Sequence, residues 1–268
     1  MESANGNKPK IIHYWSDARF DSVDFTIAQS KLFSDFHEYS IALSPSDIKK
    51  GHSVYQSVVL RQFMNEFPAG TIHICNLSFI AIQTKRYIIA KYNNQIFLGP
   101  DNGFFYLAFP QDQVSYFIIP TQGIPLPIKA LTDIYIPTVK KILHENLFDL
   151  IESTYEPKVH MVKPLALNPT IAGNVIRLTC TYVDNSGNAF FNIHKAEFNE
   201  LCNGRKFRIK TLFETFDRIS TDYDDVPEGQ ILCLFGYGDI FQIAQNAGNV
   251  AHALAIEPNS QIIVEFLD

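Results

Sequence analysis

Short apolar runs alternate with longer amphipathic stretches along the first half of the chain, a pattern typical of strands that alternate with helices. Predicted strands cover residues 9–15, 39–43, 71–80, 87–92, 95–98 and 104–109. Predicted helices cover residues 25–36, 51–67 and 131–151. Asn93 and Asn94 tolerate left-handed backbone, so we expect them to turn a hairpin between two of these strands. The alternation as a whole predicts a three-layer α/β domain.

The pattern changes over residues 156–169, where three prolines favour an extended linker over a helix. Beyond this stretch, predicted strands cover residues 174–183, 189–193, 206–212, 230–235 and 261–266. Gly, Asp and Pro turns separate them, so we expect this half to be mainly β and to form a small barrel. We therefore predict an N-terminal α/β domain of residues 1–158, a linker of residues 159–170 and a C-terminal domain of residues 171–268.

The composition is that of a folded protein, because 46% of the 268 residues are hydrophobic and 19% are charged. A net charge of −6 disfavours a general nucleic-acid binder, which needs Lys and Arg to meet phosphates. The start lacks a signal-peptide core and no run is long enough to span a membrane, so we expect a cytoplasmic protein without a membrane partner. The four cysteines have no C-x-x-C spacing, so we expect them to be reduced core residues and expect no metal.

Two polar islands interrupt the apolar pattern, each directly after a predicted strand. They are Gly99-Pro100-Asp101-Asn102-Gly103 and Asp184-Asn185-Ser186-Gly187-Asn188. Asp, Asn and Gly tolerate left-handed backbone and offer polar groups to a ligand, so each island is either an ordinary turn or a binding loop.

Seven motifs follow one another in the order found in one enzyme family. Ser16-Asp17-Ala18-Arg19 resembles the Thr-Asp-Phe-Gly after that family's first strand, and the first island reproduces its Gly-Pro-Asp-Asn-Gly signature. The second island looks like its Asp-x-Phe-Gly-Asn. The other similar segments are Pro45-Ser46-Asp47-Ile48, Phe67-Pro68-Ala69-Gly70-Thr71, Asp133-Ile134-Tyr135-Ile136-Pro137 and Gln242-Ile243-Ala244-Gln245-Asn246. Nearly the whole chain thus resembles the S-adenosylmethionine (SAM) hydroxide adenosyltransferase family, which is related to the SAM-dependent chlorinases and fluorinases.

The resemblance implies that water or hydroxide attacks C5′ of SAM, and that adenosine and methionine are released. It also implies a homotrimer in which the α/β domain of one subunit and the β domain of its neighbour hold SAM together. Under this resemblance the Asp17 carboxylate would accept hydrogen bonds from both ribose hydroxyls, because it is charged and has two acceptor oxygens. The other ligand-binding residues that the resemblance implies are Asp24, Thr26, Asp101, Asn102, Asp184 and Asn188.

The chain departs from the family at the residues that place the nucleophile. Ser78 lies where the hydrolytic members have Asp, Lys85 where they have Arg, and Ala130 where they have His. Lys cannot reproduce the planar guanidinium group of Arg, and the Ala side chain can neither transfer a proton nor form a hydrogen bond. The first hypothesis is an adenosyltransferase in which Ser78 and Lys85 form an altered catalytic pair. The alternatives are a catalytically silent SAM- or adenosine-binding protein, a purely structural trimer and, more weakly, a halogenase-like enzyme, whose Tyr-Pro-Ala-Thr-Gly turn is absent here.

Simpler structural roles compete with several of these assignments. Asp17 at a strand end could be a helix N-cap, although the resemblance favours ribose binding. His73 alternates with apolar neighbours, so we expect a core histidine rather than a catalyst. Trp15 and the aromatic residues 104–106 are expected in the core rather than against an adenine ring. Lys85 either ends a solvated strand or holds an anion in the site.

Overall fold

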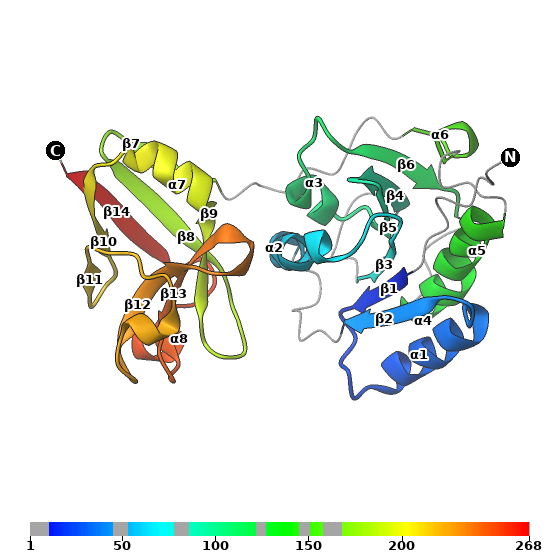
Figure 1. Cartoon of the computed structure of the whole chain (residues 1–268), viewed down its shortest axis with the longest axis horizontal. Coiled ribbons are helices and arrows are strands. Elements are labelled where there is room, and N and C mark those ends of the chain that lie inside the picture. Colours follow the sequence, from blue (N-terminus) through cyan, green and yellow to red (C-terminus); the bar gives the residue numbers. More distant parts are fainter. Residues whose placement is uncertain are drawn as a thin grey trace, which may run out of the picture. The chain divides into compact units, whose positions relative to one another are not determined.

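The structure is a computed structural model that describes residues 11–44, 53–77, 86–121, 127–144, 151–157 and 168–267. The chain divides into two compact units, Met1–Pro164 and Leu165–Asp268 (Figure 1). Most of the predicted linker lies outside the described residues, so its bounds stay a prediction.

The N-terminal unit is built on a six-stranded sheet in the order β2-β1-β3-β5-β4-β6. Its strands are β1 (Ile11–Ser16), β2 (Ser40–Ser44), β3 (Ile72–Asn76), β4 (Tyr87–Tyr92), β5 (Gln95–Pro100) and β6 (Ser115–Ile119). Strands β2, β1, β3 and β5 are parallel, whereas β4 runs antiparallel to both β5 and β6. The predicted hairpin is confirmed, because Asn93 and Asn94 both have positive φ angles between β4 and β5.

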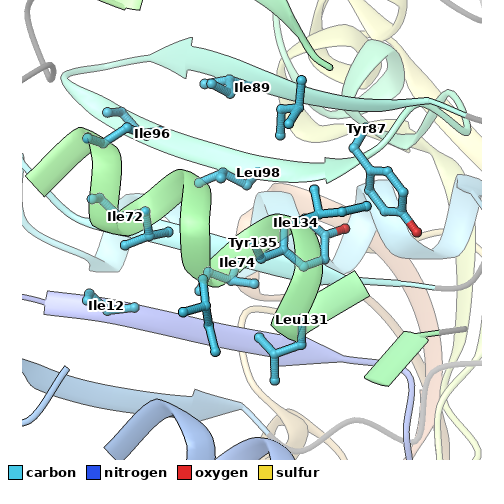
Figure 2. Packing of buried hydrophobic residues seen from close by; sticks show 14 of the residues in the cluster. Ile12, Ile72, Ile74, Tyr87, Ile89, Ile96, Leu98, Leu131, Ile134 and Tyr135 are labelled. Carbon is cyan, nitrogen blue, oxygen red and sulfur yellow. The ribbon is translucent and has the colours of Figure 1, made fainter. Parts of the chain in front are cut away.

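Helices cover both faces of this sheet, which confirms the three-layer prediction. One face carries α1 (Val23–Asp35), α4 (Pro127–Ala130), a π-helix (Leu131–Tyr135) and α5 (Ile136–His144). The opposite face carries α2 (Ser53–Phe63) and α3 (Phe104–Ala108), and the short α6 (Ile151–Thr154) follows later in the chain. Figure 2 shows Leu131, Ile134 and Tyr135 packing over Ile74 and Leu98 of the sheet. Period-two alternation along the strands supplies both apolar faces.

The strand predicted over residues 104–109 is wrong, because this segment forms helix α3. Aromatic residues have a strand preference, but local hydrogen bonding decides otherwise here. Gly103 adopts φ 90° at the N-cap, and the side-chain oxygen of Asn102 accepts the backbone N–H of Phe104 at 3.1 Å. The helix then buries Phe104 and Phe105 against the sheet.

The C-terminal unit is an antiparallel sheet in the order β11-β10-β14-β8-β9-β13-β12, with β7 paired to β8. Its strands are β7 (Thr170–Ala172), β8 (Val175–Val183), β9 (Ala189–His194), β10 (Lys206–Lys210), β11 (Thr215–Phe216), β12 (Ile231–Phe235), β13 (Ile240–Gln245) and β14 (Gln261–Leu267). The backbone N–H of Ser220 donates to the carbonyl of Cys233, so the chain after β11 reaches β12 at the far end of the sheet. The sheet is therefore nearly closed, which confirms a small barrel.

The described part of this unit also contains the short α-helices α7 (Lys195–Cys202) and α8 (Val250–Ala253), and 3-10 turns at Tyr223–Asp225 and Tyr237–Asp239. Phe198 of α7 is 2% exposed and is the centre of an aromatic cluster inside the barrel. Its ring contacts those of Phe207, Phe235, Phe241 and Phe266. Helix α7 thus closes the barrel core with an aromatic side chain.

Candidate functional site

Three neighbouring parallel strands of the N-terminal unit place polar residues at one edge of the sheet. β1 ends at Ser16 and is followed by Asp17, β3 ends at Asn76, and β5 is followed by Asp101. Ser16 and Asn76 are register partners, so these two strand ends lie side by side. In open α/β sheets, ligands bind outside the carboxyl ends of the strands. This carboxyl edge is therefore the candidate site.

The Tyr14 phenol lies at the centre of the hydrogen bonds at this edge. The Asn76 side-chain amide donates to the Tyr14 oxygen at 3.0 Å, and the Ser16 hydroxyl is also hydrogen-bonded to it. Burial raises the pKa of Tyr14, and the nearby charges of Asp17 and Asp24 add to the rise. Tyr14 therefore stays a neutral phenol, and the negative charges of Asp17 and Asp24 both oppose its ionisation.

Asp17 is 4% exposed and does not cap helix α1. The N-cap is Ser22, whose hydroxyl accepts the backbone N–H of Phe25 at 3.2 Å. The N-cap interpretation of Asp17 is therefore wrong. Asp17 instead lies just beyond the carboxyl end of a parallel strand, where open α/β sheets bind ligands.

Asp24 and Thr26 lie in the first turns of α1, and both are exposed. The charge of Asp24 contributes to the raised pKa of Tyr14, after burial and after the charge of Asp17. The Thr26 hydroxyl donates to the carbonyl of Ser22 at 3.3 Å. Asp24 thus has an electrostatic link to the carboxyl edge, whereas the Thr26 hydroxyl bonds within its own helix.

Two further phenols form a buried layer beneath the edge. Tyr87, the first residue of β4, has a pKa raised to about 12 by burial. Tyr135, at the end of the π-helix, donates to the carbonyl of Cys75 at 3.3 Å, and its ring meets that of Tyr87 edge-on at 5.4 Å. Burial also raises the pKa of Tyr135. This layer supports the site with neutral side chains.

Asp101 and Asn102 are 0% and 2% exposed. The Asn102 amide donates to Gln56 at 2.9 Å while its oxygen accepts from Phe104, so both ends of this side chain hold the turn between β5 and α3. Gly99 is required by packing, because a Cβ there would lie 2.9 Å from the Phe105 ring. The first island therefore builds a turn at the carboxyl edge and buries the Asp101 carboxylate there.

In the C-terminal unit, Asp184 and Asn188 form two hydrogen bonds with each other. The Asp184 carboxylate accepts the backbone N–H of Asn188 at 2.8 Å and its side-chain amide at 3.0 Å. Both oxygens thus close the turn between β8 and β9. The Tyr223 phenol accepts from Gln242 at 3.0 Å, and the charge of Asp184 helps raise the pKa of Tyr223, after burial as the main cause. Ligand binding by this pair stays a prediction.

The altered catalytic positions are only partly visible. Ser78 and Lys85 lie outside the described residues. Ala130 is fully buried at the end of α4, within the core on the α1 face of the sheet. A buried methyl group offers neither a proton nor a hydrogen bond to a nucleophile.

Of the aromatic residues expected in the core, Trp15, Phe104 and Phe105 are buried at 1%, 0% and 1% exposure, whereas Tyr106 is only partly buried. His73 is likewise buried and hydrogen-bonded, as expected of a core histidine. Sequence reasoning missed Tyr14 and Asn76, although a polar Asn inside the apolar strand predicted over residues 71–80 could have pointed to Asn76. The described part of the chain contains no group of three or more His, Cys, Asp or Glu placed to hold a metal ion. Nor does any helix within it have the length and apolar character to cross a membrane.

Comparison with known proteins gives the same picture of the fold. The chain is similar to the crystal structure of an uncharacterized conserved protein from Thermotoga maritima, with a TM-score of 0.76, 18% identity, and coverage of 94% of this chain and 99% of that one. A conserved hypothetical protein from Thermus thermophilus matches with a TM-score of 0.68, 17% identity, and coverage of 97% and 100%. At this identity the likeness shows the fold.

Both halves of the chain match domains of one sequence family. Residues 27–149 match the SAM hydroxide adenosyltransferase N-terminal domain, and residues 178–263 match the C-terminal domain of the same family. The first match includes β3 and β5 with their carboxyl ends, and the second includes most of the barrel, whereas β1 and Asp17 lie before residue 27. The chain therefore belongs to the SAM hydroxide adenosyltransferase family.

Proposed function

We propose that this protein binds SAM at the carboxyl edge of its N-terminal sheet and transfers the adenosyl group to water. The buried carboxylate of Asp17, between Ser16 and the start of α1, is the observation that carries the proposal. Family membership supports SAM as the ligand. Two ribose hydroxyls can both donate to one carboxylate, which gives the site a charge-assisted grip on the nucleoside.

The reaction needs little acid–base chemistry from the protein. The oxygen of a water molecule forms a bond to C5′ while the C5′–sulfur bond breaks, and methionine leaves with the electron pair as a neutral thioether. The attacking water loses one proton to solvent, and the products are adenosine and methionine. Because a sulfonium is a good leaving group, alignment and desolvation of the nucleophile supply most of the acceleration. Asp24 and Thr26 would meet the methionine end of the substrate.

Ser78 and Lys85 are the proposed nucleophile-positioning residues. A hydroxyl and an ammonium group can together hold a water or hydroxide by hydrogen bonds. Under the same proposal the family's homotrimer forms, and Asp184 and Asn188 of a neighbouring copy complete the ligand site. Light scattering of the purified protein tests this assembly, and a monomer at micromolar concentration would contradict it.

A second candidate function is SAM or adenosine binding without turnover. The buried methyl of Ala130 favours it, because no imidazole is available at that position. The positions proposed to hold the ligand keep their polar side chains, whereas those that would drive the chemistry are altered.

One experiment separates the two candidates. Purified protein is incubated with SAM, and adenosine and methionine are quantified by chromatography beside calorimetric titration with SAM. Equal amounts of both products above the uncatalysed rate support the adenosyltransferase. Binding heat without products supports the silent binder, and neither binding nor products at millimolar SAM would reject both.

A further inference from the structure

A continuous line of hydrogen-bonded side chains crosses the α2 face of the N-terminal sheet. The Ser44 hydroxyl lies 2.8 Å from Nε2 of His13, and Nδ1 of His13 lies 2.8 Å from Nδ1 of His73. Nε2 of His73 lies 2.8 Å from the side-chain oxygen of Gln95. Four strands therefore contribute one residue each to a single line.

The direction of every bond in this line follows from its inner end. The Gln95 amide nitrogen donates to the carbonyls of Met64 and Phe67 at 3.1 and 2.8 Å, so the Gln95 oxygen can only accept. His73 must then donate from Nε2, which leaves its Nδ1 as the acceptor in the neutral ring. His13 must donate from Nδ1, which leaves Nε2 as an acceptor facing Ser44. The Ser44 hydroxyl therefore donates to an imidazole base.

Burial keeps both imidazoles neutral and in place. His13 and His73 are 0% exposed, and their rings stack on Phe67 at 4.5 Å and on Phe97 at 4.3 Å. Burial lowers the pKa of both rings, and His73 adds to the effect on His13. Ser44, by contrast, is partly exposed at the carboxyl end of β2. The line thus has a buried inner end at His13 and His73 and an outer end at the partly exposed Ser44.

We propose that Ser44 is an activated nucleophile that takes an acyl group from small carboxylic esters, with His13 as its general base and His73 as the positioning residue. A serine, a base and a third group that orients the base make up a nucleophilic hydrolytic site, whatever the fold. This inference is independent of SAM binding, because none of its groups is among those proposed to hold SAM.

The bond changes balance without a cofactor. Oγ of Ser44 forms a bond to the ester carbonyl carbon while its proton passes to Nε2 of His13. The imidazolium of His13 shares its Nδ1 proton with the acceptor nitrogen of His73. The C–O bond of the ester then breaks, and the leaving alcohol takes the proton from Nε2. Water, deprotonated by the same nitrogen, hydrolyses the acyl-serine to the acid and restores Ser44.

Labelling with a fluorophosphonate probe and with p-nitrophenyl acetate tests this site, with the modified residue located by peptide mass spectrometry. We expect one adduct, at Ser44 of the folded protein, which is lost in Ser44→Ala. Ser40→Ala is the matched control, because Ser40 is an exposed serine of the same strand. His13→Gln should slow labelling by about 100-fold or more, the contribution typical of a general base.

The role of His73 has a readout of its own. In His73→Gln the electrostatic effect that lowers the pKa of His13 is removed, so labelling should begin to fall at a higher pH than in the wild-type protein. A purely structural role of His73 would leave this pH profile unmoved. Circular dichroism of each variant shows whether it folds.

Wild-type protein alone keeps the proposal falsifiable if a histidine variant fails to fold. Native protein should label at Ser44 much faster than the same protein unfolded in urea, because only the folded state places His13 at the hydroxyl. Equal labelling in both states, adducts at other serines instead, or no adduct at Ser44 would overturn the proposal.

Discussion

Asp17 is the residue whose chemistry most directly tests the SAM site. Asp17→Asn keeps the shape of the side chain but removes its charge and one of two acceptor oxygens. Hydrogen bonds to charged groups contribute about 1.5–3 kcal/mol. We therefore expect the variant to bind SAM on the order of 10- to 100-fold more weakly, measured by calorimetric titration.

Asp21→Asn provides the matched control for that measurement. Asp21 lies four residues further along the chain, is exposed, and is paired with Arg19 at 2.7 Å. Its loss should leave SAM affinity within about twofold, since surface ion pairs contribute little. Equal affinities for Asp17→Asn and wild type would remove Asp17 from the site.

The two buried histidines predict how stability depends on pH. In the unfolded chain a histidine has a pKa near about 6.5, whereas burial lowers the pKa of His73 to about 3 and that of His13 well below its usual value. Below about pH 6.5 both imidazoles are therefore protonated in the unfolded state but stay neutral in the folded state. The free energy of unfolding falls as the pH drops toward about 3. The lowered pKa of His73 alone should reduce the free energy of unfolding by about 2 kcal/mol near pH 5.

Urea unfolding over a pH series measures this dependence. His37→Asn is the control, because His37 is exposed and its removal should leave the slope unchanged. Constant stability of the N-terminal unit between about pH 7 and about pH 5 would show that the buried rings titrate normally.

Side-chain partners were the hardest feature to predict at this scale. The alternation of His73 with apolar neighbours was enough to indicate a core histidine, but its partner His13 lies 60 residues away. Asn76 and Tyr14 are separated by 62 residues. Such contacts depend on which strands pair and in what register, and the local pattern of one segment specifies neither.

At the scale of elements, local patterns predicted the strands and helices whose signals are strong and short in range. The Asn93-Asn94 hairpin is an example, because two residues with positive φ set both the turn and the register. Helix α3 was missed because its five residues, three of them aromatic, favour a strand. The feature that starts the helix is the left-handed N-cap residue Gly103 before it. Strand β13 was missed because Gln242 and Gln245 interrupt its apolar run, although Gln242 is 3% exposed and donates a hydrogen bond to Tyr223.

The turn between β8 and β9 depends on a glycine for two separate reasons. Gly187 has φ +83°, and a Cβ there would lie 2.2 Å from the side chain of Asn249. Asn249 in turn caps α8 by accepting the backbone N–H of His252 at 2.9 Å. Gly187→Ala should therefore strain the backbone and displace a helix cap at once.

Gly229→Ala isolates the first of these effects. Gly229 has φ +80°, but a Cβ there would meet nothing within 4 Å. We expect Gly229→Ala to cost about 1–2 kcal/mol from left-handed backbone alone. Gly187→Ala should cost about 1–3 kcal/mol more, from overpacking. Urea unfolding of the full chain compares them, and equal losses would show that Asn249 moves aside freely.

At the scale of the whole molecule, each unit has its own hydrophobic core. The N-terminal core lies on the two faces of one sheet, and the C-terminal core fills the barrel around Phe198. The change of composition with three prolines over residues 156–169 predicted two units, and the order of seven short motifs predicted the family. Oligomeric assembly needs surface complementarity, which no motif encodes.

Separate cores predict that the two units unfold in separate transitions. Trp15 is the single tryptophan and is buried in the N-terminal unit, so its fluorescence reports on that unit alone. Far-UV circular dichroism reports on both units. In Gly187→Ala we expect one dichroism transition to fall by on the order of 10 °C while the Trp15 midpoint stays in place. If the Trp15 midpoint falls by the same amount, then the two cores unfold as one cooperative unit, and the barrel contributes directly to the stability of the sheet that carries Asp17.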